Sequence, residues 1–328
     1  MKRWIFLVSA IMLFLLTACS DDSGDENSGK SENDTERTIK IEDGIGEKTI
    51  KGTPKKIVVL EWFYAEHLLA LGIQPAGVPN IDEYNKWINI DEELADSVQD
   101  VGTRQEPNLE AISRLNPDLI IAAKFRHGEL LDQLNKIAPT VTFAPYGNGS
   151  ENLHDEMMNE FKTIAKIVDK EDKAKQEIAD LNAFYDEQKE RVAELGMDGK
   201  EYIATLAFSV QNSPVLRLYT DNSIVAQVMK RLGFKNAYQT EKPEQYGFSE
   251  VGIEALQNFQ KDNLQFLYIV QEDDNVFENQ LKENPVWENL SFVKSGNVHQ
   301  IPGDTPVFGG VLSAKVLADQ LITSMQEE

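Results

Sequence analysis

The chain has 328 residues and a formal net charge of −23, from 32 lysines and arginines against 55 aspartates and glutamates. At about 100–200 residues per domain, this length allows about two domains. Such an acidic chain is not expected to bind nucleic acid, because phosphate binding requires clustered positive side chains. The single cysteine excludes a disulfide framework and a cysteine-based metal cluster. None of the four histidines has the spacing of a metal motif: His67, His127, His154 and His299.

The N-terminus has the pattern of a secretory signal over residues 1–18. Lys2 and Arg3 precede an apolar run, Trp4–Leu16, which is too short for a comfortable transmembrane helix. The run ends in Leu-Thr-Ala-Cys19, which resembles the bacterial lipobox, where the cysteine becomes the lipidated N-terminus. The alternatives are a plain signal or an uncleaved anchor. We favour the lipobox because the chain has no other cysteine; losing Lys2 and Arg3 would change the charge from −23 to −25.

Residues 19–37 predict a lipid-anchored, disordered tether. Positions 20–37 are acidic, rich in serine, glycine and asparagine, and free of apolar residues. Such a segment cannot bury enough surface to order itself. The protein is therefore expected at the extracytoplasmic face of the cell membrane, attached through its N-terminal lipid.

Residues 38–168 predict a first α/β lobe. Short β-branched or apolar runs at 57–60, 119–122 and 140–143 indicate buried strands, and helical patterns at 66–71 and 109–115 lie between them. Strands that alternate with helices are typical of a largely parallel sheet.

A long bridging helix is predicted over 172–196. It follows another helical pattern that starts near Glu151, and no proline or glycine interrupts it before Gly196. Asp172 is the expected N-cap. At the usual rise per residue, a helix of this length spans roughly 35 Å, enough to connect two lobes.

Residues 197–328 predict a second α/β lobe, with strands at 202–208, 215–219 and 266–270 and helices at 223–232 and 313–325. The halves form a weak internal repeat, in which Leu-Gly72-Ile corresponds to Leu-Gly233-Phe and Leu-Glu110-Ala-Ile to Ile-Glu254-Ala-Leu. The predicted fold is therefore α/β, with two Rossmann-like lobes joined by a long α-helix.

Arginine is scarce, and its positions indicate a ligand site. Three arginines follow or lie on predicted strands, near the strand ends where open sheets bind ligands: Arg104, Arg126 and Arg217. A guanidinium pairs bidentately with a carboxylate, so these residues predict an anionic ligand. The alternative for each is an ion pair with a neighbouring aspartate or glutamate. The other five lie in the signal, in the tether or on polar faces of predicted helices: Arg3, Arg37, Arg114, Arg191 and Arg231.

Aromatic side chains close to these arginines are further candidates for ligand contact. Trp62 follows the first strand, and Tyr84 and Trp87 lie in a segment, 80–93, that has no core periodicity and reads as a long loop. A place in the core is the alternative for each. Phe308, in Pro-Val-Phe-Gly-Gly, is a weaker candidate.

Motifs of catalysis are absent from the sequence, which contains no P-loop, no GxSxG and no nucleophilic cysteine pattern. The acidic run Glu272-Asp273-Asp274 is expected in a solvated loop rather than at a metal. We therefore predict a binding protein without cofactor and without directly bound metal, and not an enzyme.

Three stretches resemble iron(III)-siderophore-binding lipoproteins of ABC importers: Ile57–Val78, Val101–Ala123 and Leu216–Gly233. The resemblance covers roughly Ile39 to the C-terminus and is greatest for members that take citrate-type or citrate-hydroxamate complexes. It implies that Arg104 and Arg126 face the anionic ferric ligand, and extends less directly to Arg217. It also implies that Glu110 and Glu254 dock to arginines of the permease subunits, although Gly-Ile-Glu254 departs from the more usual Ser-Leu-Glu.

The expected protein is a monomer that captures a ferric siderophore between its lobes and delivers it to an ABC permease. The siderophore would supply the oxygen ligands of iron, which agrees with the scarcity of cysteine and histidine. The alternatives are a cobalamin or haem carrier of the same architecture, a receptor for a bare metal ion, and a lipid-anchored hydrolase.

Overall fold

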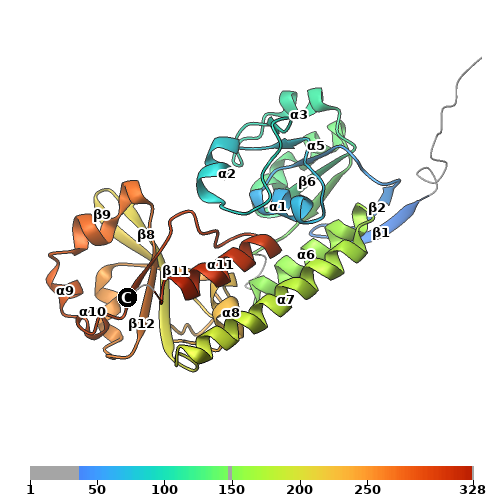
Figure 1. Ribbon diagram of the computed structural model, residues 1–328. Coiled ribbons are helices and arrows are strands. Elements are labelled where there is room, and N and C mark those ends of the chain that lie inside the picture. Colours follow the sequence, from blue (N-terminus) through green and yellow to red (C-terminus); the bar gives the residue numbers. More distant parts are fainter. Residues whose placement is uncertain (1–36, 147–149, 327–328) are drawn as a thin grey trace, which may run out of the picture.

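The computed structural model describes residues 37–146 and 150–326, which form two α/β lobes connected by a layer of three long helices (Figure 1). The predicted two-lobe α/β architecture is confirmed. The predicted signal, Cys19 and the tether up to residue 36 lie outside the described residues. No helix within the described ranges is both long and apolar enough to cross a membrane.

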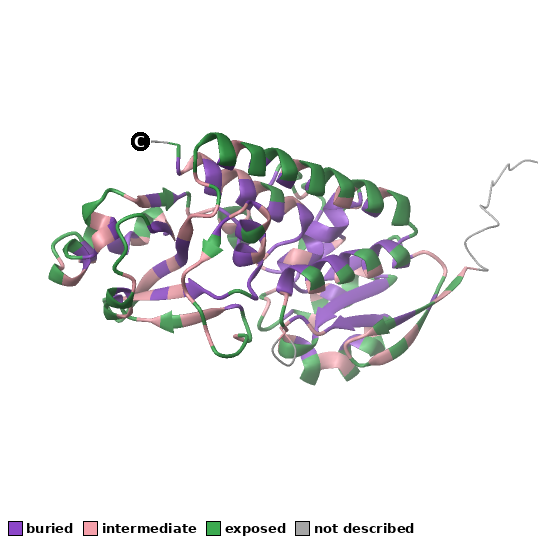
Figure 2. Cartoon of the chain, turned by 90° about the horizontal axis from the view of Figure 1, so that it is seen from below, coloured by how far each residue is buried: buried purple, intermediate pink, exposed green. Residues whose placement is uncertain are grey.

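The first lobe is built on a parallel sheet with the strand order β5-β4-β3-β6-β7. Its central strands are buried along their whole length, as is usual when helices cover both faces (Figure 2). The strands are β3 (Ile57–Val59), β4 (Gly77–Val78), β5 (Gln99–Asp100), β6 (Leu119–Ala123) and β7 (Thr140–Phe143). The helices of this lobe are α1 (Trp62–Ala70), α2 (Ile81–Trp87), α3 (Leu109–Leu115), α4 (Lys124–His127), η1 (Gly128–Leu130) and α5 (Leu131–Ile137).

A two-stranded antiparallel hairpin, β1 (Thr38–Asp43) and β2 (Gly46–Lys51), precedes this sheet. Arg37, which the sequence placed in the tether, belongs to the folded part. Its guanidinium donates to the carbonyl of Ile167 at 3.0 Å and lies 3.4 Å from the carboxylate of Asp169. The hairpin is thereby attached to the end of α6.

The second sheet is mixed rather than parallel throughout. Its strand order is β11-β9-β8-β12-β13, and β10 also pairs with β8. The chain leaves β8 through Gln211 and Asn212, both in the left-handed region (φ 49° and 65°), and this tight turn makes β9 antiparallel to β8. The strands are β8 (Glu201–Val210), β9 (Ser213–Tyr219), β10 (Lys235–Asn236), β11 (Phe248–Val251), β12 (Gln265–Ile269) and β13 (Val298–Ile301). The helices of this lobe are α8 (Ile224–Arg231), η2 (Ile253–Asn258), η3 (Glu272–Asp274), η4 (Phe277–Leu281), α9 (Pro285–Glu288) and α10 (Ser291–Lys294).

Three helices connect the lobes: α6 (Leu153–Ile167), α7 (Glu171–Glu194) and α11 (Val311–Thr323). The predicted bridging helix is α7, which runs beside α6 below both lobes (Figure 1). Its N-cap is Lys170; Asp172, expected as the cap, lies in the first turn and pairs with Lys175 at 2.8 Å. The C-terminal helix α11 packs on α7 and also contacts α1 of the first lobe and α8 of the second. The lobes are thus joined by a helical layer and not by one helix alone.

One hydrophobic core runs through this layer. The three helices of the layer, together with α1 of the first lobe and α8 of the second, contribute buried side chains to the same cluster, for example Leu68, Phe161, Leu181, Val228 and Leu317. The outer faces of the two sheets form separate, smaller clusters. Because relative motion of the lobes would disturb this shared core, the structure favours small lobe movements.

Candidate binding cleft

A cleft of ≈ 720 Å³ lies between the two lobes. This volume falls within the usual range of small-molecule sites. The first lobe contributes the start of α1, the helix α2, the turn after β5 and the helix α4. The second lobe contributes β8, β9, β11, the end of β12 and the segment before α11. All three arginines predicted from the sequence line it.

Arg104 is held in the turn that follows β5. Its backbone N–H donates to Oδ1 of Asn80 at 2.8 Å, and its carbonyl lies 2.8 Å from Nε2 of His127. Burial lowers the pKa of His127, so the ring is neutral and Nε2 can donate while Nδ1 accepts from the N–H of Ala123. The Arg104 guanidinium stacks on Trp62 with 3.5 Å between its carbon and the ring centroid. The turn and the indole together fix the plane of this cation.

Arg126 lies on the short helix α4 directly after β6, and its partner is Glu61, the N-cap residue of α1, two positions after the end of β3. Nε of Arg126 is 2.5 Å from Oε1 of Glu61, and Nη1 of Arg104 is 4.0 Å from Oε2. Burial raises the pKa of Glu61, while Arg126 and then Arg104 act in the opposite direction. Sequence reasoning missed Glu61, although an acidic residue directly after a buried parallel strand was a signal that could have found it.

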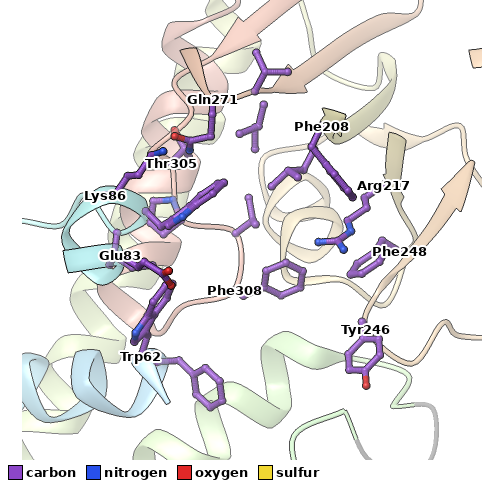
Figure 3. Close-up of a pocket in the computed structure, with 18 of the residues that line it drawn as sticks. Trp62, Glu83, Lys86, Phe208, Arg217, Tyr246, Phe248, Gln271, Thr305 and Phe308 are labelled. Carbon is purple, nitrogen blue, oxygen red and sulfur yellow. The ribbon is translucent and has the colours of Figure 1, made fainter. Parts of the chain in front are cut away.

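Arg217 forms the opposite wall, on β9. Its guanidinium lies between the rings of Phe208 and Phe248, 4.7 Å from each centroid (Figure 3). Nε and Nη2 each lie 2.9 Å from Oε1 of Glu250, the neighbour of Arg217 across the ladder. We expected Arg217 near the carboxyl end of a parallel strand. It reaches this edge because β9 turns back beside the end of β8, where Arg217 faces Leu206.

Each predicted arginine therefore both lines the cleft and has a glutamate partner. The ion pairs that the sequence left open as an alternative are present, and they do not remove the side chains from the site. The remaining helix-surface arginines bridge neighbouring groups outside the cleft: Arg114 to Glu110, Arg191 to Asp319 and Arg231 to Asp155.

The structure separates the three predicted aromatic residues. Trp62 and Trp87 line the cleft, whereas Tyr84 is 2 % exposed and packs edge-on against Trp62 from behind, with 6.1 Å between the ring centroids. The prediction of a loop at 80–93 was wrong at 81–87, which form α2. This helix has only Tyr84 buried, so the sequence carries no apolar stripe by which to recognise it.

An aromatic belt, largely missed by the sequence analysis, continues the lining. Tyr146 of the first lobe lies 5.4 Å from Tyr246 and 6.4 Å from Phe308 of the second, measured between ring centroids. Phe308, a weak candidate from sequence, lies near the middle of the cleft (Figure 3). The belt comprises Phe125, Tyr146, Phe208, Tyr246, Phe248 and Phe308.

One charged pair of lining residues also crosses the cleft. Nζ of Lys86 on α2 lies 3.1 Å from Oδ2 of Asp273 on η3. The acidic run 272–274 forms η3, in which Glu272 and Asp273 are exposed to solvent, as expected. Asp273 nevertheless links the lobes, and Asp274 accepts hydrogen bonds from N and Oγ of Ser209 at 2.7 and 2.5 Å. Within the described ranges, no group of three or more histidine, cysteine, aspartate or glutamate side chains is placed to hold a metal ion.

The two glutamates that the repeat aligned lie outside the cleft. Glu110 is exposed in the first turn of α3, where it pairs with Arg114 at 2.7 Å, and Glu254 is exposed in the first turn of η2. Both therefore belong to the outer surface of their lobes, one on each.

Residues 57–305 match the family model described as "Periplasmic binding protein", and the chain belongs to this family of binding proteins. Among its relatives, the Fe(3+)-citrate-binding protein YfmC of Bacillus subtilis is 34% identical over 326 residues, covering 98% of this chain and 96% of YfmC. The probable siderophore-binding lipoprotein YfiY of the same organism is 33% identical over 340 residues, covering 98% of each. A crystal structure of the siderophore-binding protein FhuD of Vibrio cholerae, bound to Fe3+–Desferal, superimposes with a TM-score of 0.74 at 30% identity, covering 83% of this chain and 98% of FhuD.

Proposed function

We propose that this protein binds a ferric siderophore in the cleft between its lobes and passes it to an ABC importer. The observation that carries the proposal is that each of the two facing walls of the cleft presents an arginine stacked on aromatic rings. Arg104 lies on Trp62 in one wall, and Arg217 lies between Phe208 and Phe248 in the other. Relatives whose names state that they bind ferric citrate or siderophores support it. Citrate-type and citrate-hydroxamate complexes, which present carboxylate oxygen atoms, are the proposed ligands.

The cleft would contact the siderophore around the iron, without a protein side chain bound to the metal itself. Planar guanidinium groups would donate to the oxygen atoms of the ligand, and the aromatic belt would cover its apolar surfaces. The siderophore itself would supply the hard oxygen ligands that Fe³⁺ prefers. The proposed role involves binding and release, without turnover.

Delivery would use the outer surfaces of the lobes. Glu110 and Glu254, one on each lobe, are the proposed contacts with arginines of the permease subunits. The lipid on Cys19 would keep the monomeric receptor at the extracytoplasmic face of the membrane, with lobes at 38–168 and 197–328 and the bridging helix at 172–196.

The direct test is a titration of the protein with ferric complexes, in which binding is measured by the quenching of tryptophan fluorescence. We expect Arg104→Ala and Arg126→Ala each to weaken binding at least about tenfold, since each removes a charged hydrogen-bond donor from a half-buried site. Arg114→Ala is the matched control, because this arginine is exposed on α3 and pairs with Glu110. Unchanged affinity in both cleft variants would contradict the site assignment. A panel that includes haem and cobalamin separates the remaining ligand classes by their absorbance.

A further inference from the structure

Glu61 adds a negative charge at the point where an anionic ligand would need positive ones. Its side chain is 1% exposed and is shared by Arg126 at 2.5 Å and Arg104 at 4.0 Å. A buried carboxylate is costly unless it is paired. Burial raises the pKa of Glu61, and the two arginines act in the opposite direction and so favour the ionised form. The triad of Arg104, Arg126 and Glu61 then carries one net positive charge instead of two.

The other two cations of the lining are also paired with acids. Arg217 is paired with Glu250, and Lys86 with Asp273. Counting the charged side chains that line the cleft gives four cations and four acids. Glu61 differs from the other acids because it is buried between two arginines. The lining residues are Arg104, Arg126, Arg217 and Lys86 against Glu61, Glu83, Asp273 and Asp274.

Glu61 also determines which donors remain for a ligand. Its carboxylate accepts a hydrogen bond from Nε of Arg126, so this donor is not available to a ligand. Nη1 of Arg104, by contrast, stays 4.0 Å from Oε2 of Glu61, beyond hydrogen-bond distance, and the side chain is 26% exposed. Arg104 is held in place by its stack on Trp62 rather than by a full set of hydrogen bonds, so its fork retains donors for a carboxylate of the ligand.

We propose that Glu61 is the specificity-determining residue that limits the negative charge of the ligand. This inference rests on the proposed function. Iron(III) bound by two hydroxamates and one doubly charged hydroxy-carboxylate retains a single negative charge, which matches the charge of the triad. Iron(III) bound only by citrate carboxylates and alkoxides retains more. Glu61 therefore favours mixed citrate-hydroxamate complexes over all-carboxylate ones.

The test compares two ferric probes of different charge, ferric citrate and iron(III) desferrioxamine B, in wild-type protein and in Glu61→Gln. The glutamine keeps the shape of the side chain and removes its charge. We expect the ratio of the two affinities to shift toward ferric citrate by about tenfold or more, the effect of one unit charge at cleft distances. Asp172→Asn removes the same charge from an exposed position on α7 and should leave the ratio unchanged.

A charge-compensated pair of variants keeps the test valid if Glu61→Gln alone fails to fold. Arg126→Gln lowers the charge of the triad to zero and should shift the ratio away from ferric citrate. Adding Glu61→Gln to it restores one net positive charge and should return the ratio to the wild-type value, even though both absolute affinities fall.

Two results would overturn the proposal, and they are distinguishable. In the first, wild-type protein binds both probes, but the ratio of affinities is the same in Glu61→Gln as in wild type. An equal ratio in Arg126→Gln and in the double variant Arg126→Gln/Glu61→Gln has the same meaning. Glu61 then has only a structural role. If neither wild-type protein nor any variant binds a ferric complex, the proposed function fails and the role of Glu61 fails with it.

Discussion

Ser313, in the first turn of α11, donates two hydrogen bonds to the buried carboxylate of Glu66 on α1: its N–H at 2.7 Å and its hydroxyl at 2.5 Å. Burial raises the pKa of Glu66, and the bonds from Ser313 and from the N–H groups of Gly310 and Leu312 act in the opposite direction. The first lobe is thereby tied to the start of the C-terminal helix at a point without access to water.

Ser313→Ala removes one of these donors and leaves part of a buried carboxylate unsatisfied. We expect the free energy of unfolding to fall by about 1–3 kcal/mol, measured by urea denaturation. Ser324→Ala is the control, since this hydroxyl at the opposite, C-terminal end of α11 donates to the nearby carbonyl of Leu321, at 3.1 Å. Equal stabilities of the two variants would contradict the importance of the Glu66 contact.

Gly310 allows this close approach between α1 and the N-terminus of α11. A Cβ atom there would lie 2.7 Å from Nδ1 of His67 and 2.9 Å from Oε1 of Glu66. We expect Gly310→Ala to destabilise the protein by roughly 1–3 kcal/mol through overpacking. In Gly128→Ala the new methyl group meets nothing within 4 Å, and the melting temperature should stay at or slightly above that of the wild type. A melting temperature for Gly310→Ala as high as for Gly128→Ala would contradict the prediction, because it would show that His67 and Glu66 can move to accommodate the methyl group.

His67 predicts a dependence of stability on pH. Burial lowers its pKa from the usual 6.5 to about 3, and both ring nitrogens lack hydrogen-bond partners among the described residues. Below pH 6.5 the unfolded chain therefore binds a proton that the folded chain does not. The free energy of unfolding should fall by about 1.4 kcal/mol per pH unit from this residue as the pH decreases toward 3.

The measurement is urea denaturation at a series of pH values for wild-type protein and His67→Leu. The variant should lose this part of the slope, whereas His154, whose pKa burial lowers to about 4, contributes with the same sign in both proteins. Parallel stability profiles would refute a neutral, buried His67.

The exposed glutamates predict a separation of binding from uptake. Glu110→Ala and Glu254→Ala should leave the affinity for the ferric ligand unchanged, because neither side chain lines the cleft. Uptake of radioactive iron by whole cells should fall for each and fall further for the double variant, whereas Glu47→Ala, an exposed change on the β-hairpin, should have no effect. Normal uptake in the double variant would contradict the proposed docking of Glu110 and Glu254 to the permease.

The predictable parts of this fold are those in which a local pattern matches the packing. The β-branched run at 57–60 and the apolar run at 119–122 have no polar face, so only a buried strand accommodates them, and both occur in the parallel sheet. The helix α7 is evident from a periodicity that no proline or glycine interrupts. Arg104 and Arg126 were predicted at the cleft, which both line, because segments that follow parallel strands reach the carboxyl edge of the sheet.

The features that escaped prediction depend on contacts distant in the sequence. Glu61 and Arg126 are separated by 65 positions and meet because β3 and β6, the strands that precede them, are neighbours in the sheet. The reversal of β9 depends on the left-handed backbone of Gln211 and Asn212, a pair that lacks the glycine usual in such turns. Arg37 looked like part of a polar tether because its partners are backbone carbonyls at the end of α6.

The hydrophobic core shared by the lobes and the helical layer has a consequence for iron supply. If the lobes barely move when a ligand enters, empty and loaded receptors show nearly the same outer surface to the importer. Empty receptors would then compete with loaded ones for each transporter. Throughput would therefore depend on the fraction of receptors that carry iron and on how many receptors share one transporter.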